Sequence, residues 1–316
     1  MKRALLIGID HYANSNDLGG CVADVDALQP LLSRSEDDSP NFDCQKRTSD
    51  TGGVTRDELL TDLDDLLAPG AEVAVLYFAG HGDGRTTDVV LVTEDGTTGT
   101  PGIAFSEVLA KVEQSPVGEI IVILDCCFSG AAGGIPQLGT TTSALRNGVS
   151  ILMASRGDQT SAEVAGRGLF STYLCGALEG GAADVLGKVN IAGLYSYLDE
   201  SFGAWDQRPT FKANVDRLHV IRACNPPIPL HQLRRINEFF PNADYVFPLD
   251  PSYEPTEQPS NPEHEEIFDI LQRYRANKLV SPVGEEHMYY AAMNSAACKL
   301  TPLGQHYWHL ATEDRF

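Results

Sequence analysis

Six short, almost uninterrupted apolar runs punctuate the first 223 residues, and amphipathic stretches separate them. A run such as EIIVILD is rich in β-branched residues, which is typical of a parallel strand buried on both faces. The runs expected to form strands are Ala4–Ile9, Val73–Ala79, Val89–Val92, Ile120–Leu124, Val149–Ala154 and Leu218–Ile221. Strand–helix alternation with connections of this length predicts an α/β fold, with a mostly parallel sheet and helices on both faces.

Helical periodicity fills the gaps between these runs. Thr55 precedes one amphipathic stretch and Glu58 follows three residues later, which is the spacing of a capping box. The expected helices are Ala23–Ser33, Arg56–Leu67, Phe105–Val112, Phe170–Leu178 and Ile191–Ser201.

The character of the chain changes after residue 223, which predicts a domain boundary. Residues 224–262 are dense in proline and acids, and because proline cannot complete helix or ladder hydrogen bonds we expect an extended linker. Residues 263–316 are periodic again and predict a small, mainly helical C-terminal domain, for which a winged helix is one arrangement. Residues 225–316 hold 13 acidic and 7 basic side chains, so a regulatory or partner-binding contact with protein is favoured over contact with phosphate.

Net charge, cysteine usage and the N-terminal stretch each favour some partners and locations over others. The 316 residues carry a net charge of −21, which disfavours nucleic acid and anionic membranes and favours basic ligands, although solubility alone explains it equally well. Seven scattered cysteines show neither a CxxC pair nor zinc-site spacing, which favours free thiols in a reducing, cytoplasmic location. The opening MKRALLIGID has too short an apolar stretch for a signal peptide and is interpreted as a first buried strand.

Two of the expected strands end abruptly in residues that can do chemistry. One run continues into Gly80-His81-Gly82, and another into Asp125-Cys126-Cys127. Because the carboxyl ends of parallel strands share one edge of the sheet, a histidine and a cysteine can meet there. An adjacent imidazole promotes formation of the nucleophilic thiolate. Taken singly, each is more often a turn residue or a small buried side chain, but the pair favours a catalytic site.

YFAGHG and, some 40 residues on, DCCFSG resemble the histidine and cysteine signatures of caspases and metacaspases. ALLIGIDHY with LGGCVADVDALQPLL resembles the opening of metacaspases, and ILMASRGDQTSAE with GLFSTYLCGALEGGAADV resembles the segment after their nucleophile. The resemblance spans residues 3–215 and implies a caspase-like peptidase of bacterial type, with His81 as general base and Cys127 as nucleophile. The N–H groups of Gly82 and Cys127 would form the oxyanion hole, and Cys126 would point back toward the sheet. Phe128 departs from the histidine that many metacaspases carry there.

The same resemblance implies a pocket for a basic substrate residue. The acids that bind arginine or lysine in metacaspases correspond to Asp24 and Asp125, with Cys21 nearby. Paired carboxylates can bind a guanidinium through charge-assisted, bidentate hydrogen bonds. Ala79 stands where the family has a serine, so one polar contact is missing. Capping roles for Asp24 and Asp125 are the alternative interpretation.

The resemblance also suggests how the protein is regulated and where it acts. Calcium is possible by family analogy but is assigned to no residue. Asp37-Asp38 and Asp62-Asp64-Asp65 are acidic clusters, and the latter group fits a solvated helix face. Cleavage after Arg146 in the glycine-rich segment 131–147 is a hypothesis for activation. Relatives in bacteria are linked to stress or antiphage cell death. A catalytically silent scaffold and an Asp-specific protease remain as alternatives; the latter would need arginines in place of the two acids.

Overall fold

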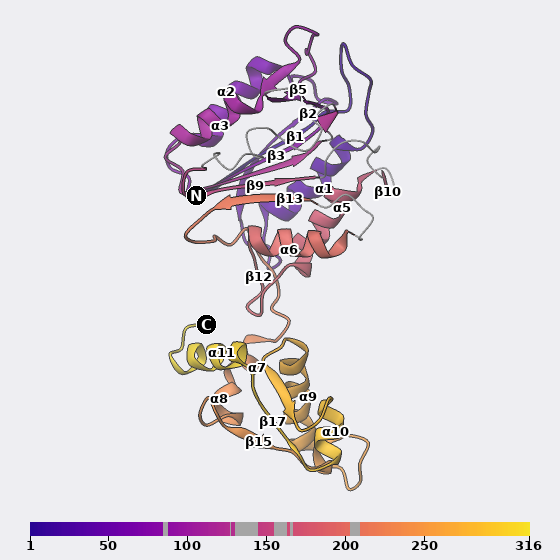
Figure 1. The fold of residues 1–316 in the computed structure, drawn as a ribbon, viewed down its shortest axis with the longest axis vertical. Coiled ribbons are helices and arrows are strands. Elements are labelled where there is room, and N and C mark those ends of the chain that lie inside the picture. Colours follow the sequence, from indigo (N-terminus) through magenta and orange to yellow (C-terminus); the bar gives the residue numbers. More distant parts are fainter. Residues whose placement is uncertain (85–87, 127, 130–144, 155–162, 165–166, 203–208) are drawn as a thin grey trace. The chain divides into compact units, whose positions relative to one another are not determined.

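The computed structural model describes residues 1–84, 88–126, 128–129, 145–154, 163–164, 167–202 and 209–316, with backbone only for 128–129 and 163–164. They form two compact units (Figure 1). The first consists of Met1–Ala183 and Lys188–Cys224, and the second of Asp184–Gly187 and Asn225–Phe316. Within the described ranges, no helix has the length and apolar character to cross a bilayer.

A six-stranded sheet in the order β13-β9-β7-β3-β1-β2 organises the first unit. All neighbouring strands are parallel except β13, which runs antiparallel to β9 at one edge. The strands are β1 (Lys2–Gly8), β2 (Phe42–Thr48), β3 (Val73–Ala79), β7 (Glu119–Asp125), β9 (Val149–Met153) and β13 (Thr210–Asn214). The expected α/β class with a mostly parallel sheet is confirmed.

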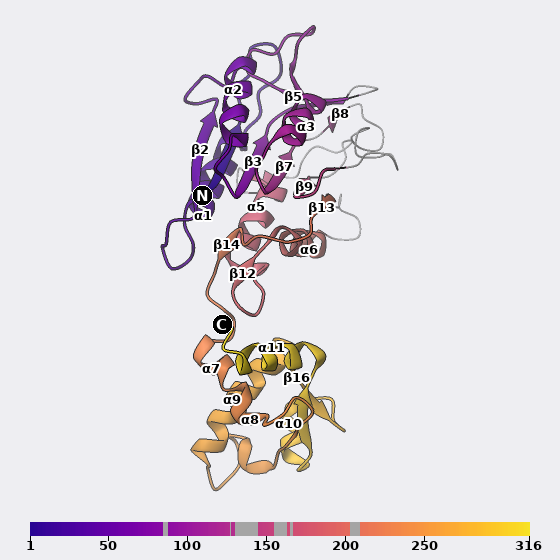
Figure 2. The same ribbon diagram turned by 90° about the vertical axis from the view of Figure 1, so that its left-hand side faces the viewer.

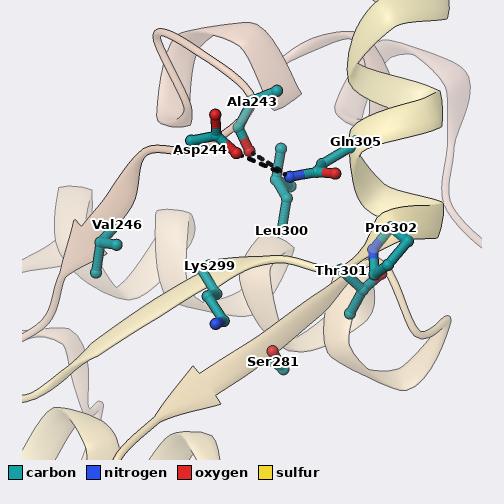
Figure 3. Close-up of a pocket in the computed structure, with 9 residues that line it drawn as sticks. All are labelled: Ala243, Asp244, Val246, Ser281, Lys299, Leu300, Thr301, Pro302 and Gln305. Carbon is teal, nitrogen blue, oxygen red and sulfur yellow. Dashed lines mark hydrogen bonds between the residues drawn. The ribbon is translucent and has the colours of Figure 1, made fainter.

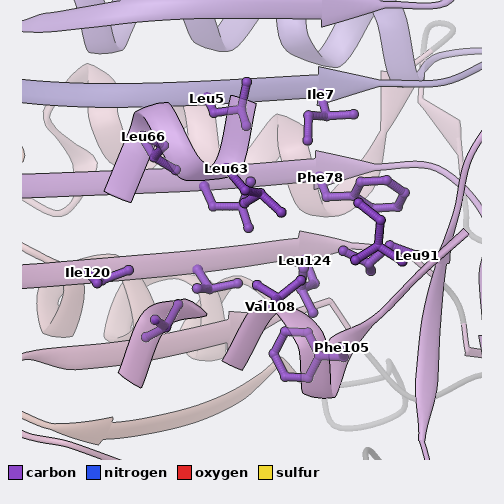
Figure 4. Close-up of a cluster of buried hydrophobic side chains, with 14 of the residues drawn as sticks. Leu5, Ile7, Leu63, Leu66, Phe78, Leu91, Phe105, Val108, Ile120 and Leu124 are labelled. Atoms are coloured by element: carbon purple, nitrogen blue, oxygen red, sulfur yellow. The ribbon is translucent and has the colours of Figure 1, made fainter. Parts of the chain in front are cut away.

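Helices cover both faces of this sheet, as Figure 1 shows. α2 (Arg56–Leu67) and α3 (Phe105–Gln114) bury one face, and α1 (Cys21–Ser33), α5 (Leu169–Gly176) and α6 (Ile191–Ser201) bury the other. Leu63 and Leu66 of α2, and Val108 of α3, pack on strand residues in the first core (Figure 4). The capping box forms at Thr55, and α2 has the predicted bounds.

A small four-stranded sheet, β6-β5-β4-β8, extends beyond the carboxyl ends of β3 and β7. In Figure 2, β5 and β8 lie beside α3. Its strands are β4 (Gly82–Gly84), β5 (Val89–Val92), β6 (Gly102–Ala104) and β8 (Phe128–Ser129). Two-stranded pairs join β10 (Glu163–Val164) to β11 (Arg167–Gly168) and β12 (Lys188–Val189) to β14 (Arg222–Ala223), and a π-helical turn, η1 (Ala177–Gly181), follows α5.

One strand expectation was wrong and one edge strand was missed. Leu218–Ile221 is not a strand, and Leu218 is 36% exposed; the antiparallel edge strand is instead β13, earlier in the chain. β2 was not predicted, because only Phe42 and Thr48 of its seven residues are fully buried. Strands at an edge need few apolar residues, so their sequences carry a weak periodic signal.

The second unit has its own core and a three-stranded antiparallel sheet in the order β15-β17-β16. Helices make up most of its regular structure, as expected, and the sheet is an addition to the predicted helices. Its elements are α7 (Leu230–Arg234), α8 (Ile236–Phe239), β15 (Val246–Pro248), η2 (Pro251–Tyr253), α9 (Pro262–Ala276), β16 (Val280–Val283), α10 (Met288–Met293), β17 (Ala297–Leu300) and α11 (Pro302–Thr312).

The expected linker at 224–262 is wrong for most of its length. Leu233, Phe240 and Tyr253 from this segment are buried in the core of the second unit. Two prolines, Pro251 and Pro262, stand in the first turn of a helix, where the missing N–H has no helical partner to lose. These two prolines mark helix starts, and the segment belongs to a folded unit.

Candidate active site

The register of the strands aligns the two chemistry-bearing strand ends. Ala79, the last residue of β3, pairs with Asp125, the last residue of β7. Beyond them, Gly82 of β4 pairs with Phe128 of β8 in parallel, at the same sequence offset. The chain on both sides of His81 is therefore in register with the chain on both sides of Cys127, which itself lies outside the described residues.

His81 is held at this edge through its imidazole and its main chain. Its Nε2 lies 2.7 Å from the carbonyl oxygen of Asn16. Its backbone N–H donates to the Tyr12 hydroxyl at 2.8 Å, and the two rings lie 4.7 Å apart between centroids. Because a carbonyl oxygen only accepts hydrogen bonds, the contact with Asn16 requires the proton on Nε2 and leaves Nδ1 as the basic nitrogen.

Asn16 and Tyr12 were not identified from the sequence as site residues. Both belong to the segment between β1 and α1, which begins at the same edge of the sheet as Gly80-His81-Gly82. That placement was the available signal, because residues after a parallel strand gather at its carboxyl end.

The start of α1 brings Asp24 to the site. Asp10, just beyond β1, accepts the main-chain N–H groups of Cys21 and Val22 at 2.9 and 3.2 Å, which stabilises the first turn of the helix. A Cβ at Gly8 would lie 2.5 Å from the Cys21 carbonyl oxygen, so only glycine lets β1 and α1 approach this closely. The thiol of Cys21 has a pKa raised by burial and by the charge of Asp10, so it remains protonated.

Asp24 is buried, with 3% of its surface exposed, and the protein supplies its hydrogen bonds. Its carboxylate accepts the Ser171 hydroxyl, the Gly168 N–H at 3.3 Å and the Arg167 Nε at 3.3 Å. Burial raises the pKa of Asp24, and these three donors oppose the increase.

Asp125 lies beside Asp24 with fewer donors around it. Its Oδ2 accepts the Tyr77 hydroxyl at 3.1 Å. Burial and the neighbouring charge of Asp24 raise the pKa of Asp125 to about 7. Two negative charges this close repel each other, so ionisation of both carboxylates is disfavoured and one of them binds its proton more tightly.

A cavity of about 110 Å³ connects these groups. His81, Asp24 and Asp125 all line it, as do Cys21 and Cys126. Cys126 is 4% exposed and also belongs to the core cluster on the face that α2 and α3 cover. The structure thus brings together the described members of the expected site, including Gly82, which directly follows His81 in β4.

Among the described residues, no group of three or more potential ligands is arranged to hold a metal ion.

The expectation that Asp62 belongs to a solvated face is wrong. Asp62 is 3% exposed and binds Arg47 at 2.6 Å, which satisfies its buried charge.

Arg146 serves as a cap in this conformation. Its Nε and Nη2 donate to the carbonyls of Val112 and Val117, each at 2.9 Å, and its Nη1 to the carbonyl of Asn147 at 2.8 Å. Arg146, after which self-cleavage was hypothesised, therefore has its guanidinium hydrogen-bonded to carbonyl groups at the end of α3.

A second cavity, of about 460 Å³, lies in the second unit on the outer face of its sheet (Figure 3). Lys299 of β17 stands between Val246 and Ser281 of the flanking strands, and Gln305 of α11 donates to Ala243 and Asp244 at its rim. No residue expected from the sequence to be catalytic lines it.

Sequence comparison finds metacaspases among the relatives of this chain. Metacaspase-3 of Trypanosoma cruzi is 28% identical over 223 residues, which cover 57% of this chain and 59% of that protein. Metacaspase-1B of Aspergillus fumigatus is 29% identical over 171 residues, which cover 46% of this chain and 39% of that protein. The chain thus spans about half the length of these relatives.

Structural comparison finds the same fold in solved proteins. Caspase-1 of Spodoptera frugiperda superposes with a TM-score of 0.51 and 14% identity, over 71% of this chain and 90% of that one. A protein from Geobacter sulfurreducens superposes with a TM-score of 0.50 and 17% identity, over 68% and 94%. The caspase domain model of peptidase family C14 matches residues 1–218. This chain therefore belongs to the caspase-domain family of cysteine peptidases.

Proposed function

We propose that this chain is a cysteine endopeptidase that hydrolyses peptide bonds after arginine, and after lysine as a second choice, with His81 and Cys127 as its dyad. The observation that carries the proposal is the contact between His81 Nε2 and the Asn16 carbonyl, beside a cavity lined by Asp24 and Asp125. That contact directs the basic Nδ1 away from Asn16, and the strand register on both sides of His81 and Cys127 favours their meeting.

The chemistry follows from these roles. Nδ1 of His81 takes the thiol proton of Cys127, and the thiolate attacks the carbonyl carbon of the scissile bond. The electron pair of the carbonyl moves to its oxygen, where the N–H groups of Gly82 and Cys127 stabilise the negative charge. Collapse of this intermediate breaks the C–N bond, and the leaving amine takes the proton from His81. Water, deprotonated by His81, then hydrolyses the thioester and restores the thiol.

The acidic pocket supports the preference for a basic residue. A guanidinium or ammonium in the cavity neutralises carboxylate charge that the protein has removed from water. A substrate aspartate there would place a third carboxylate beside the first two, which disfavours Asp-specific cleavage.

A fluorogenic panel with arginine, lysine and aspartate at the cleavage position tests the proposal. We expect hydrolysis of the arginine peptide, slower hydrolysis of the lysine peptide and none of the aspartate peptide. Cys127→Ala should abolish turnover, while Cys126→Ala, its matched neighbour, should retain it. Loss of activity only in the Cys126 variant would overturn the choice of nucleophile, and aspartate-only hydrolysis would overturn the pocket.

The alternative function is a catalytically silent scaffold that recruits partners through the second unit. The open cavity at Lys299, lined by both apolar and polar side chains, offers a place for a protein contact in that unit. A natively folded chain that hydrolyses none of the three peptides, yet binds a regulatory protein through residues 225–316, would support the scaffold.

The cellular setting is a further part of the proposal. We place the chain in the cytoplasm, in a stress or antiphage cell-death pathway. Phage plating efficiency on cells that produce the parent chain or its Cys127→Ala variant tests this role, and equal plating would contradict it.

A further inference from the structure

We propose that Arg167 is a positioning residue for substrate specificity: its guanidinium holds and charge-compensates Asp24, so that Asp125 is the carboxylate that meets the basic side chain of a substrate. This inference rests on the proposed function, because it concerns the same pocket. The two carboxylates therefore have different roles: Asp24 is paired with Arg167, and Asp125 binds the substrate cation.

The contacts of Arg167 separate it from the cavity. Its Nε lies 3.3 Å from Asp24 Oδ1, and its Nη2 lies 3.2 Å from Sγ of Cys175, a buried residue of α5. The guanidinium thus lies against α5, while the next residue, Gly168, lines the cavity. A Cβ at Gly168 would approach Asp24 Oδ2 to 3.2 Å and Asp125 Oδ2 to 3.5 Å, so β11 runs directly beside both acids.

The hydrogen bonds divide the two acids further. Asp24 accepts donors from Arg167, Gly168 and Ser171, which occupy most of the positions that a carboxylate offers. Asp125 accepts the Tyr77 hydroxyl and is more exposed than Asp24. A cationic side chain entering the cavity therefore finds its partner in Asp125.

Among the residues that the structure describes, the titratable or charged groups that line this cavity or touch the two acids come from several elements. They are Cys21 of α1, Tyr77 of β3, His81 after β3, Cys126 after β7, Arg167 of β11 and Cys175 of α5, with the Ser171 hydroxyl as a neutral donor. Arg167 is the cation in this set, and it lowers the pKa of both Asp24 and Asp125 against the increase that burial causes. Asp125 already binds a proton with a pKa of about 7 while Arg167 is in place. Without Arg167 the pair would hold that proton to a higher pH, and a substrate cation would have to displace it there.

Binding to the Cys127→Ala protein tests this inference without turnover. The probe is Nα-acetyl-arginine amide, titrated by calorimetry between pH 5.5 and 9. Arg167→Gln keeps a hydrogen-bond donor near Asp24 but removes the charge, and Arg167→Lys keeps the charge. Arg273→Met, at an exposed ion pair of α9, is the control for a general loss of positive charge.

We expect Arg167→Gln to move the midpoint of the affinity–pH profile upward by about one unit or more. Arg167→Lys should restore most of the parent midpoint, and Arg273→Met should leave it unchanged. An unchanged midpoint in a folded Arg167→Gln protein would overturn the inference. So would tighter binding at every pH, which would mean that Arg167 competes with the substrate.

A second measurement separates this inference from the proposed function. The carboxyl ¹³C shift of Asp125, followed by NMR over the same pH range, needs no ligand. If the probe fails to bind the Cys127→Ala parent protein, the basic pocket of the proposed function is wrong. The Asp125 midpoint still decides the role of Arg167: an upward move in Arg167→Gln supports charge compensation, and no move contradicts it.

Discussion

His81 Nε2 and the carbonyl oxygen of Asn16 are 2.7 Å apart and join segments 65 residues distant in sequence. The orienting partner of the imidazole is a main-chain atom, so replacing the side chain of Asn16 leaves this acceptor in place. Side chains that hold the same loop, Tyr12 above all, are the accessible targets for testing this arrangement.

Tyr12→Phe should lower kcat by about 5- to 100-fold with little change in KM. The substitution removes the acceptor of the His81 N–H, which costs about 1–3 kcal/mol when the group is buried. The loss should fall on the chemical step, because the phenol touches the histidine rather than the acidic pocket. Steady-state kinetics with the arginine peptide check this, with Tyr195→Phe as control; an unchanged kcat would show that the hydroxyl has no positioning role.

Asp125→Asn should stabilise the protein at neutral pH while removing the preference for arginine. The folded-state pKa of Asp125 is raised to about 7, so between about pH 4 and 7 the folded protein holds a proton that the unfolded chain releases. Stability therefore falls as pH rises through this window. The variant avoids that loss, worth up to about 4 kcal/mol at pH 8, and gains nothing below pH 3.5.

Urea unfolding at pH 3.5 and pH 8 measures this difference. Asp43→Asn, at an exposed position of β2, should show no comparable gain. An equal effect of Asp125→Asn at both pH values would contradict the raised pKa.

His219→Ala should destabilise the first unit by about 2–4 kcal/mol, because it removes a donor from a buried carboxylate. Glu119 is 1% exposed, and its Oε2 accepts both the N–H and the Nδ1 of His219 at 2.9 and 2.6 Å. Adding Glu119→Gln should recover part of the loss, since a neutral amide is less costly to bury. Denaturant unfolding checks both changes beside the exposed His231→Ala, and equal effects of the two histidine variants would remove the basis of this prediction.

Arg146→Met should lower the free energy of unfolding by about 1–3 kcal/mol, since the guanidinium bonds the carbonyls of Val112 and Val117. The same contacts lead us to expect no self-cleavage after Arg146 in the resting protein. Mass spectrometry of the parent chain and its Cys127→Ala variant checks this. A cut after Arg146 that appears only in the parent would show that the cap opens readily.

Strong local signals predicted the elements that carry the site. The capping box at Thr55 fixed the start of α2, and the apolar runs fixed β3 and β7. Since these signals involve neighbours within four residues, sequence alone was sufficient. The edge strand β2 and the core role of Phe240 escaped because both depend on surroundings formed by distant parts of the chain.

The site was predictable in its residue types but not in its electrostatics. A histidine and a cysteine after two strand ends indicated a shared edge of the sheet, and the family resemblance supplied Asp24 and Asp125 as pocket residues. The partnership of Asp24 with Arg167 joins positions 143 residues apart and follows no spacing rule. Likewise, the Asn16 carbonyl is an atom that every residue possesses, so no pattern of side chains marks it.

Residues 184–187 lie within the first unit's sequence yet belong to the second unit, where Val185 and Leu186 pack against the core. The polypeptide therefore passes between the units three times rather than once. A gene fusion that starts at residue 225 would lack part of the apolar packing of that unit. Exchange of this unit among related chains would have to transplant two separate pieces of sequence together.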